Sequence, residues 1–541
     1  MISRLKAKYS YGDDVWDAVE GVLSGVLQSV LSGILLYLSF PPVGWWPLAW
    51  VALVPAMAAH YRTFPDEASW MAVPTATVTF LSLHFSRVSV GFPLGAEGFH
   101  PLLKILLRNK FSILSSMFAV VGLASAFARS FQKRTGWRWT TLEPVLFWIA
   151  LDHLRDSVPV MGASASFAYS QFKVPFLVRV SALVGALGLS GTIVAVNAAL
   201  TAIVFAYFRD DRGYQWPGRA PPGIRRSMLV QAKLTFAAAA IVVLSGALAG
   251  CAGLSWSSHV TVGLVQPGRT MAFEGDSGLA AIRDLTVQAS LLGAKIVVWP
   301  EASFRDDPRK QDIWAGIQDI ARESGCYLVV PYFTEAPGFG AGPAEVPAYI
   351  NEGLFVSPSG EVLGAGAKDH PVTLLGETSV TRGKYPVFDT PWGKVGIMIC
   401  YDLNFTDTAR RLALNGAQLI CVPSNDWKAV SQAQYIYAVF RASENGVSVI
   451  KADTSYDSCI VRPDGIIAAK SLSWSGSETV LVANVPLRSG SAPAVRVSPF
   501  LGSAGLAGWL GLTAWTIWAS VSDQRRSKLP AKPEGMDGNV H

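Results

Sequence analysis

The chain has 541 residues, of which half are hydrophobic and only 16% are charged, with a formal net charge of +6. Soluble proteins usually carry about 25% charged residues, so this composition favours a membrane protein. The length is enough for two or three folded units. The basic residues lie beside apolar segments and not along one face with interleaved aromatic residues, so the net charge does not indicate a nucleic-acid-binding protein.

Several apolar runs are long enough to cross a bilayer, which takes about 20 residues in a helix. We predict a polytopic α-helical membrane domain of seven helices over 1–255 and an eighth transmembrane helix within 495–521. The expected spans are 18–40, 44–61, 69–86, 107–130, 141–155, 182–208, 232–254 and 499–521. Between the first two, Pro41-Pro42-Val43-Gly44 predicts a tight turn because proline interrupts a helix.

Basic residues cluster at alternate ends of the expected spans. They gather between Arg4 and Lys8, after the fourth span, after the sixth span, and in the tail 522–541. Eight spans put all these clusters on one side, which the positive-inside rule assigns to the cytoplasm. The segment between the seventh and eighth spans then faces outward, which in a bacterium is the periplasmic side of the inner membrane.

The segment 256–490 has the pattern of a separate domain exposed to water. Short β-branched runs such as 260–265 and 294–299 alternate with helical stretches such as 277–292 and 309–324. This alternation predicts an α/β domain, and the continuous apolar strands predict burial on both faces of a sheet.

The five cysteines form no CxxC pair and have no spacing to histidine that is typical of a metal site, so no metal ligation is expected. Four of them are interpreted as small buried residues: Cys251, Cys326, Cys421 and Cys459. The fifth, Cys400, directly follows an expected strand.

Three polar side chains, Glu301, Lys368 and Cys400, lie just beyond expected strands. Ligand sites gather at strand ends in open α/β sheets. A thiol is a nucleophile once a carboxylate has taken its proton, and a lysine ammonium stabilises the oxyanion that forms. The set is therefore suited to acyl transfer through a thioester. From the spacing alone, ordinary structural roles remain the stronger alternative.

Three motifs surround this set: Val298-Trp299-Pro300-Glu301-Ala302-Ser303, then Lys368, then Ile399-Cys400-Tyr401-Asp402-Leu403-Asn404-Phe405. In order and in sequence they resemble the catalytic motifs of the nitrilase (carbon–nitrogen hydrolase) superfamily. The resemblance covers roughly 260–485 and implies an αββα sandwich. It also implies that Glu301 is the general base, Lys368 the oxyanion stabiliser and Cys400 the nucleophile.

Further motifs indicate one particular family within this superfamily. They are Leu38 to Pro42, Trp46 to Ala49, Phe167 to Gln171, Gly188 to Gly191 with Asn197, Val262 to Pro267, Ser424 to Trp427 and Arg441 to Glu444. With a nitrilase-like domain between a seventh and an eighth span, they resemble the apolipoprotein N-acyltransferase family. The resemblance implies a monomer without cofactor or metal. In this family a phospholipid is the acyl donor, and the α-amine of the diacylglyceryl-cysteine of an apolipoprotein is the acceptor.

The resemblance also implies supporting residues. Glu377 matches a loop whose glutamate supports the site, and Tyr401 and Asp402 are expected to shape the nucleophile's pocket. Solvation of Glu377 and simple packing of the other two are the alternative roles. His370 is interpreted as a loop histidine, because Glu301 already fills the role of base.

Two loops, 366–377 and 425–428, depart from the usual pattern of the family. They concern substrate contacts more than the Glu, Lys and Cys set. A membrane-tethered carbon–nitrogen hydrolase (amidase) that uses water as the acyl acceptor is therefore the alternative function. The intact motifs disfavour a non-catalytic interaction protein.

Overall fold

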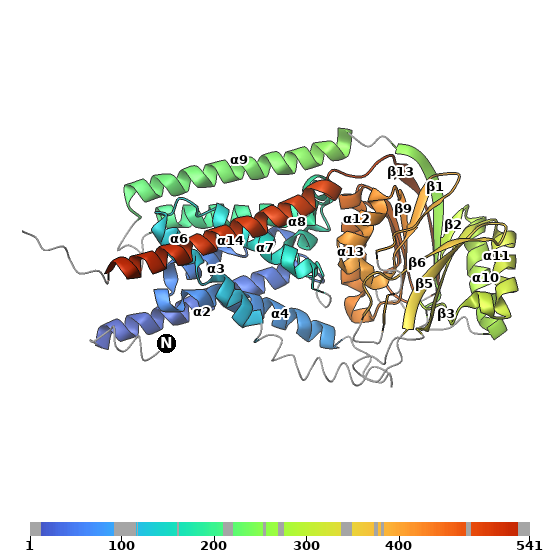
Figure 1. The fold of residues 1–541 in the computed structure, drawn as a ribbon, viewed down its shortest axis with the longest axis horizontal. Helices are drawn as coiled ribbons and strands as arrows, with labels where there is room; N and C mark the ends of the chain where they lie inside the picture. The colour runs from blue at the N-terminus through green and yellow to red at the C-terminus, as the bar shows by residue number, and fades with distance from the viewer. Residues whose placement is uncertain are drawn as a thin grey trace, which may run out of the picture.

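The computed structural model places a helical part end-on against an α/β sandwich (Figure 1). The residues that it describes are 12–90, 115, 117–158, 162–208, 220–252, 256–268, 275–336, 349–372, 377–379, 383–471 and 478–527. The helical part includes the last helix of the chain. Its helices are α2 (Gly12–Ser39), α3 (Val54–Ala58), α4 (Ala72–Val90), α6 (Ala128–Arg134), α7 (Leu142–Asp156), α8 (Pro175–Tyr207), α9 (Pro222–Ala252) and α14 (Ala494–Ser527).

Four helices among the described residues are long and apolar enough to cross a membrane. They are Trp16–Ser39, Pro175–Tyr207, Pro222–Leu248 and Ala494–Arg525. They correspond to the expected spans 18–40, 182–208, 232–254 and 499–521. The helical part is thus a membrane-compatible region with four candidate spans in the described part of the chain.

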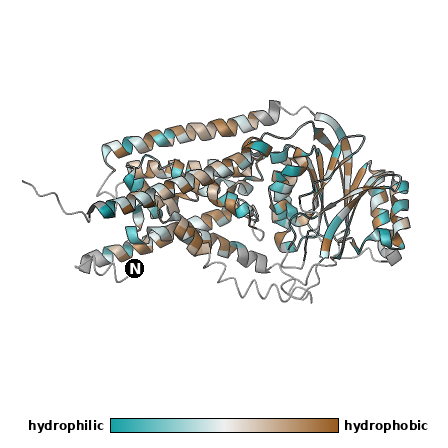
Figure 2. Ribbon diagram, in the orientation of Figure 1, coloured by the Kyte–Doolittle hydropathy of each residue, from teal (hydrophilic) through white to brown (hydrophobic). Residues whose placement is uncertain are grey.

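The outer faces of α9 and α14 are apolar. Leu234 and Leu244 on α9, and Phe500 and Trp518 on α14, are between 61% and 71% exposed, and Figure 2 shows hydrophobic colours along much of both helices. Large apolar side chains are unfavourable in water. These faces are therefore suited to the hydrocarbon of a bilayer.

The remaining expected spans fall on shorter or less apolar segments. The predictions 69–86 and 141–155 lie on α4 and α7, which have 19 and 15 residues. The first part of 107–130, residues 107–114, lies outside the described residues. The tight turn after the first span is confirmed, because the N–H of Gly44 donates to the carbonyl of Phe40 at 2.9 Å.

The expected span 44–61 is wrong as a single helix. Three short pieces replace it: the 3₁₀-helix η1 (Trp46–Trp50), α3, and the π-helix η2 (Ala59–Thr63). Pro55 stands at the start of α3 and has no N–H to continue a helical ladder. Asn197 of α8 accepts a hydrogen bond from the N–H of Leu53 at 2.9 Å. An interrupted backbone is tolerated in apolar surroundings where a neighbouring helix supplies such partners.

α8 bends at Gly185, whose φ is +70°. A side chain there would lie 2.6 Å from Ser498 of α14, so the close approach requires glycine. The bend frees the N–H of Ala186, and Glu444 of α13 (Lys428–Asn445) accepts it at 3.1 Å. The bend is therefore part of the contact between the helical part and the sandwich.

The sandwich contains two sheets. The first has the strand order β13-β1-β2-β4-β5-β6, with β3 paired to β4, and the second has the order β12-β11-β10-β9-β8-β7. The strands are β1 (Trp256–Gln266), β2 (Ile296–Val298), β3 (Phe304–Arg305), β4 (Tyr327–Glu335), β5 (Tyr349–Val356), β6 (Val362–Ala367), β7 (Val387–Asp389), β8 (Lys394–Ile397), β9 (Leu419–Ser424), β10 (Ser448–Asp453), β11 (Cys459–Val461), β12 (Ile467–Lys470) and β13 (Thr479–Arg488). The central strands β1, β2 and β4 are parallel, as are β8, β9 and β10.

Helices cover the outer face of each sheet. α10 (Gly275–Leu291) and α11 (Ile313–Ser324) cover the first sheet, and α12 (Asp407–Leu414) and α13 cover the second (Figure 1). The two sheets bury an apolar core between them that includes Val262, Val298, Ile397 and Ile450. This order of layers is the expected αββα sandwich.

The chain enters and leaves the sandwich through neighbouring strands. β1 follows α9, β13 precedes α14, and the two strands pair antiparallel, with Val262 opposite Ala483. Both connections to the helical part therefore start from the same edge of the first sheet.

Candidate active site

Glu301 lies just beyond the carboxyl end of β2 and is 6% exposed. Its backbone N–H donates to the carbonyl of Ser424 at the end of β9, which ties the two sheets together here. Its Oε1 accepts from Lys368 Nζ at 2.9 Å and from Asn351 Nδ2 at 2.6 Å. Its Oε2 makes no hydrogen bond to the residues that the structure describes, so this oxygen is available to accept a proton.

Lys368 directly follows β6 and is 3% exposed. Its Nζ lies 2.9 Å from Oε1 of Glu301 and 2.9 Å from Oε1 of Glu377. An ammonium group has three N–H donors. Two are used within the described part of the chain, and the third remains for an anionic oxygen of a substrate.

Cys400 begins the 3₁₀-helix η7 (Cys400–Asn404) shortly after β8. Its φ is +46°, a left-handed conformation that is uncommon for a residue with a side chain and is found at functional sites. The charges of Glu301 and Lys368 both act on the thiol. The structure thus brings together the three residues singled out from the sequence, each at a strand end.

A second carboxylate contacts the thiol. The Sγ of Cys400 donates to Oδ1 of Asp426 at 3.7 Å. The other oxygen of Asp426 lies 2.7 Å from Nζ of Lys451, which also lies 3.0 Å from Asp453. All three of these charged residues are buried. A buried ion pair of this kind holds its carboxylates in fixed positions, because breaking it would leave an uncompensated charge.

The electrostatics favour a neutral thiol beside a charged lysine. Burial, followed by the charge of Glu301, raises the pKa of Cys400 well above its usual range, although Lys368 acts in the opposite direction. Burial disfavours the Lys368 ammonium, but Glu301 and Glu377 outweigh it and raise the pKa of Lys368. A neutral thiol can act as a nucleophile only if a nearby base takes its proton.

Glu377 and Asp402, expected as supporting residues, hold the loop that follows Lys368. Oε2 of Glu377 accepts from the N–H of Val372 at 2.6 Å, while its Oε1 holds Lys368. The solvated alternative for Glu377 is therefore wrong, since this side chain is buried. Residues 373–376 of the atypical loop lie outside the described residues.

Asp402 joins the loop that follows Lys368 to the residue that precedes Cys400. Its carboxylate accepts from the backbone N–H groups of Ile399 at 2.9 Å, Asp369 at 3.1 Å and His370 at 2.7 Å. Burial raises the pKa of Asp402 to about 7, although these hydrogen bonds favour the ionised form. Tyr401 packs edge-on against Phe405, with ring centroids 5.3 Å apart.

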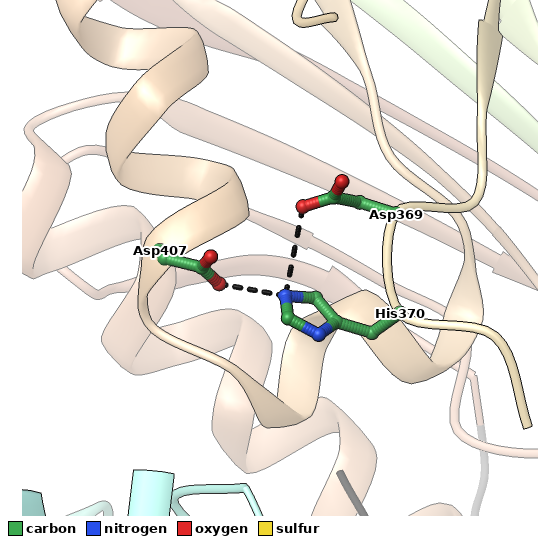
Figure 3. A group of neighbouring side chains, drawn as sticks. All are labelled: Asp369, His370 and Asp407. Atoms are coloured by element: carbon green, nitrogen blue, oxygen red, sulfur yellow. Dashed lines mark hydrogen bonds and ion pairs between the residues drawn. The ribbon is translucent and has the colours of Figure 1, made fainter. Parts of the chain in front are cut away.

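His370 lies in a cluster with Asp369 and Asp407, and their ligand atoms are within 4.8 Å of one another (Figure 3). The Nε2 of His370 is 2.7 Å from Oδ1 of Asp407. Asp369 accepts from Tyr385 and Thr408 at 3.0 Å. The 2.7 Å contact is that of a hydrogen bond between the imidazole and the carboxylate. His370 is thus a satisfied loop histidine, as expected.

Sequence reasoning missed the roles of Asn351, Asp426 and Lys451. A usable signal existed for Lys451, because a lysine continues the apolar run 447–450, and a buried charge needs a partner. No local signal identifies Asn351, whose contact with Glu301 spans 50 positions in the chain. Three of the remaining cysteines, Cys326, Cys421 and Cys459, are buried and free, as expected. The side chain of Cys251 is outside the described part.

Two families match the chain. The carbon–nitrogen hydrolase family matches residues 261–492, and the apolipoprotein N-acyltransferase N-terminal domain matches residues 32–199. The chain is 26% identical to the apolipoprotein N-acyltransferase of Geobacter metallireducens, over 82% of this chain and 86% of that one. It is also 26% identical to the apolipoprotein N-acyltransferase of Gloeobacter violaceus, over 82% and 85% of the two chains.

Among solved structures, an amidase from Nesterenkonia sp. is similar to 43% of this chain over 93% of its own, at 22% identity and a TM-score of 0.34. One matching family covers the sandwich and the other covers the helical part. The two curated relatives span both parts in one chain. The protein therefore belongs to the apolipoprotein N-acyltransferase family of the nitrilase superfamily and is an acyltransferase.

Proposed function

We propose that Cys400 carries an acyl chain from a phospholipid to the α-amine of the diacylglyceryl-cysteine of an apolipoprotein. Glu301 acts as the general base and Lys368 as the oxyanion stabiliser. The observation that carries this proposal is the buried contact of Lys368 with Glu301 at 2.9 Å, beside a cysteine in a left-handed turn. The apolar faces of α9 and α14 support it, because both substrates carry acyl chains that reside in a bilayer.

In the first half-reaction the sulfur of Cys400 attacks the carbonyl carbon of a phospholipid ester. The thiol proton moves to Oε2 of Glu301, and the third N–H of Lys368 stabilises the oxyanion. The ester C–O bond then breaks, and Glu301 returns the proton to the departing oxygen. A lysophospholipid leaves, and the acyl chain remains as a thioester on Cys400.

In the second half-reaction the acceptor amine attacks the thioester carbon. Glu301 takes a proton from the amine, the new C–N bond forms and the C–S bond breaks. The proton goes to the sulfur, which restores the thiol. Exclusion of water from the site limits hydrolysis of the thioester. As written, neither half-reaction needs a cofactor or a metal ion.

We further propose a monomer with about eight membrane spans. Residues 1–255 form the membrane domain, 256–490 the catalytic domain, 495–521 the last span and 522–541 a cytoplasmic tail. The basic clusters described above support an arrangement in the inner membrane with the catalytic domain in the periplasm.

The test follows the two half-reactions on the intact protein. The full-length protein in detergent micelles is incubated with phospholipid alone, and its mass is measured. We expect one acyl adduct on Cys400, which a diacylated lipopeptide discharges as a triacylated product. If the thioester forms and only water discharges it, the amidase alternative is correct.

Single substitutions test which side chains take part in acylation. Cys400→Ala should give no adduct, whereas Cys326→Ala, which removes another buried thiol, should acylate normally. Glu301→Gln should slow acylation by about 10²-fold to 10⁴-fold, the usual contribution of a general base. Normal acylation of the Cys400→Ala protein would refute the proposal.

A further inference from the structure

A small cavity lies within the helical part, away from the active site. It has a volume of about 50 Å³, and residues of η2, α3, α4, α7 and α8 are among those that line it. No described residue of the sandwich lines it. Because one water molecule needs about 10 to 15 Å³ of such space, the cavity has room for about three of them.

His60 presents an unused acceptor in the wall of this cavity. It belongs to the π-helix η2 and is 2% exposed. Its Nδ1 lies 2.8 Å from the carbonyl of Ser69. A carbonyl can only accept, so Nδ1 carries the hydrogen, and Nε2 of the neutral ring is an acceptor. This Nε2 is buried and has no hydrogen-bond partner among the described residues.

Trp148 of α7 brings an unused donor to the same cavity. Its ring stacks on that of Phe167 with the centroids 4.3 Å apart, which fixes the plane of the indole. The indole Nε1–H can only donate, and it is buried without an acceptor in the described part of the chain. A buried polar group without a partner is costly. A ligand that both donates and accepts would satisfy His60 and Trp148 together.

Most of the remaining wall is apolar and includes Leu36, Phe147 and Val194. An apolar ligand would fit these side chains but would leave the polar atoms of His60 and Trp148 unpaired. The volume and the two polar atoms therefore favour a small polar molecule.

The charges next to the cavity favour a neutral ligand. Arg129 donates to the carbonyls of His60 and Phe64 at 3.3 and 2.6 Å, and the carboxylate of Glu143 accepts from the hydroxyl of Tyr61. A cation in the cavity would meet the guanidinium of Arg129, and an anion would meet the carboxylate of Glu143. A small neutral molecule that donates and accepts is water.

The backbone around the cavity gives an independent reason to expect water. Leu53, Ala56, Met57 and His60 line it, and all four belong to the interrupted segment 44–61. Backbone that leaves the regular helix at membrane depth is tolerated where it is buried in protein or lines a water-filled cavity. π-Helical turns are also frequent at functional sites.

We propose that this cavity binds a chain of about three water molecules inside the helical part. One end of the chain donates to Nε2 of His60, and the other end accepts from the Nε1–H of Trp148. The chain hydrates the interrupted segment 44–61. The cavity lies outside the active site, so the proposal does not depend on the proposed function.

The test is radiolytic labelling of the full-length protein in detergent. A short X-ray pulse splits bound water into hydroxyl radicals, which oxidise the side chains that the water contacts. We expect oxidation of Trp148. Trp299 is the matched control, because it is 0% exposed and its Nε1 already donates to Thr286 at 3.1 Å. Trp299 should remain unoxidised.

Substitutions of His60 test the proposed chain. His60→Leu removes the acceptor and should lower the oxidation of Trp148 about tenfold, the effect of one hydrogen bond on the occupancy of the water. His60→Gln, whose side-chain carbonyl can accept, should retain most of the oxidation. His153→Leu changes a residue of α7 that does not line the cavity and should leave the oxidation unchanged.

Ala76→Leu is a second route to the same loss, because Ala76 lines the cavity from α4 and a leucine side chain there would displace water. Equal oxidation of Trp148 and Trp299 in the parent protein would show that the cavity is dry and would overturn the proposal. Undiminished oxidation of Trp148 in folded His60→Leu or Ala76→Leu protein would also overturn it, because the radicals would then come from bulk solvent.

Discussion

At the scale of single residues, two carboxylates lie near the thiol of Cys400, and they differ in whether an oxygen remains without a hydrogen-bond partner. Asp426 holds the S–H at 3.7 Å and is itself bound by the buried Lys451. Glu301 has an oxygen without a partner in the described structure. A carboxylate that is already bound fixes the thiol in place, whereas a carboxylate with a free oxygen can take its proton. We therefore infer that Asp426 positions Cys400 and that Glu301 deprotonates it.

Replacement of Asp426 should change how the thiol titrates. The Asp426 charge is one of the causes that raise the pKa of Cys400, so Asp426→Asn should lower that pKa. The rate of Cys400 alkylation by iodoacetamide at pH 8 should then rise, by up to about tenfold for one pKa unit. Burial raises the pKa of Asp426 itself to about 7. The rates of variant and parent should therefore converge below pH 7, where both side chains are neutral.

Asp389→Asn is a suitable control for this measurement. Asp389 lies on β7 of the same sheet, but its side chain is 83% exposed, so its charge is screened by solvent. Its alkylation profile should match that of the parent. Identical profiles for Asp426→Asn and the parent would exclude a positioning role for Asp426.

The positions of Glu301, Lys368 and Cys400 at strand ends could be predicted from the sequence, whereas the contacts that hold these side chains could not. Glu301, Lys368 and Cys400 each follow a β-branched run, and local pattern is enough to place such residues at strand ends. Asn351 and Asp426 act through contacts that depend on how two strands from different parts of the chain come to lie side by side. Asp426 lies in a motif that the sequence does single out, from Ser424 to Trp427. Its contact with the thiol depends on that pairing of strands, which neighbouring residues do not show.

At the scale of elements, α13 joins the catalytic sandwich to the helical part. Glu444 accepts the N–H that the bend of α8 frees, and Arg441 donates to the hydroxyl of Tyr169 at 2.6 Å. Ser443 donates to the carbonyl of Val178 at 3.0 Å. One face of a helix from the sandwich thus supplies hydrogen-bond partners for backbone groups of a candidate membrane span.

Loss of the Glu444 charge should destabilise this junction. Glu444→Gln would leave the fully buried Arg441 without its ion-pair partner, which costs about 3 kcal/mol or more. Ser443→Ala removes one hydrogen bond at the same junction and should cost about 1 kcal/mol. Thermal unfolding of the detergent-solubilised proteins should show the larger fall in Tm for Glu444→Gln. Equal shifts in the two variants would mean that the buried ion pair does not stabilise the junction.

Element prediction failed where a neighbouring helix supplies the hydrogen-bond partner of a backbone group. The segment 44–61 is as apolar as a continuous span, yet it forms three short pieces, because Asn197 supplies a partner for a backbone group that a single helix would have satisfied itself. Hydropathy records how apolar a segment is but not which neighbours provide its hydrogen bonds. The same limit applies to the bend at Gly185, since the glycine is visible in the sequence but its partner Ser498 is not.

At the scale of the whole molecule, the proposed orientation can be tested at the tail. The basic cluster at 525–532 predicts a cytoplasmic tail. A tag placed after His541 should resist external protease in intact spheroplasts and be cleaved once the membrane is opened. A second tag in the turn at Pro391, which is exposed between β7 and β8 of the catalytic domain, should be cleaved without opening. The opposite pattern would reverse the proposed topology.

The pairing of β1 with β13 has a consequence for biosynthesis. The triad and the residues that hold it all lie between these two strands, so the complete site is already synthesised before β13 emerges from the ribosome. Until then β1 presents an open edge that can pair with the wrong chain. The enzyme can therefore mature only late in its own synthesis. A stop codon shortly before residue 479 would remove none of the site residues and still prevent the site from forming.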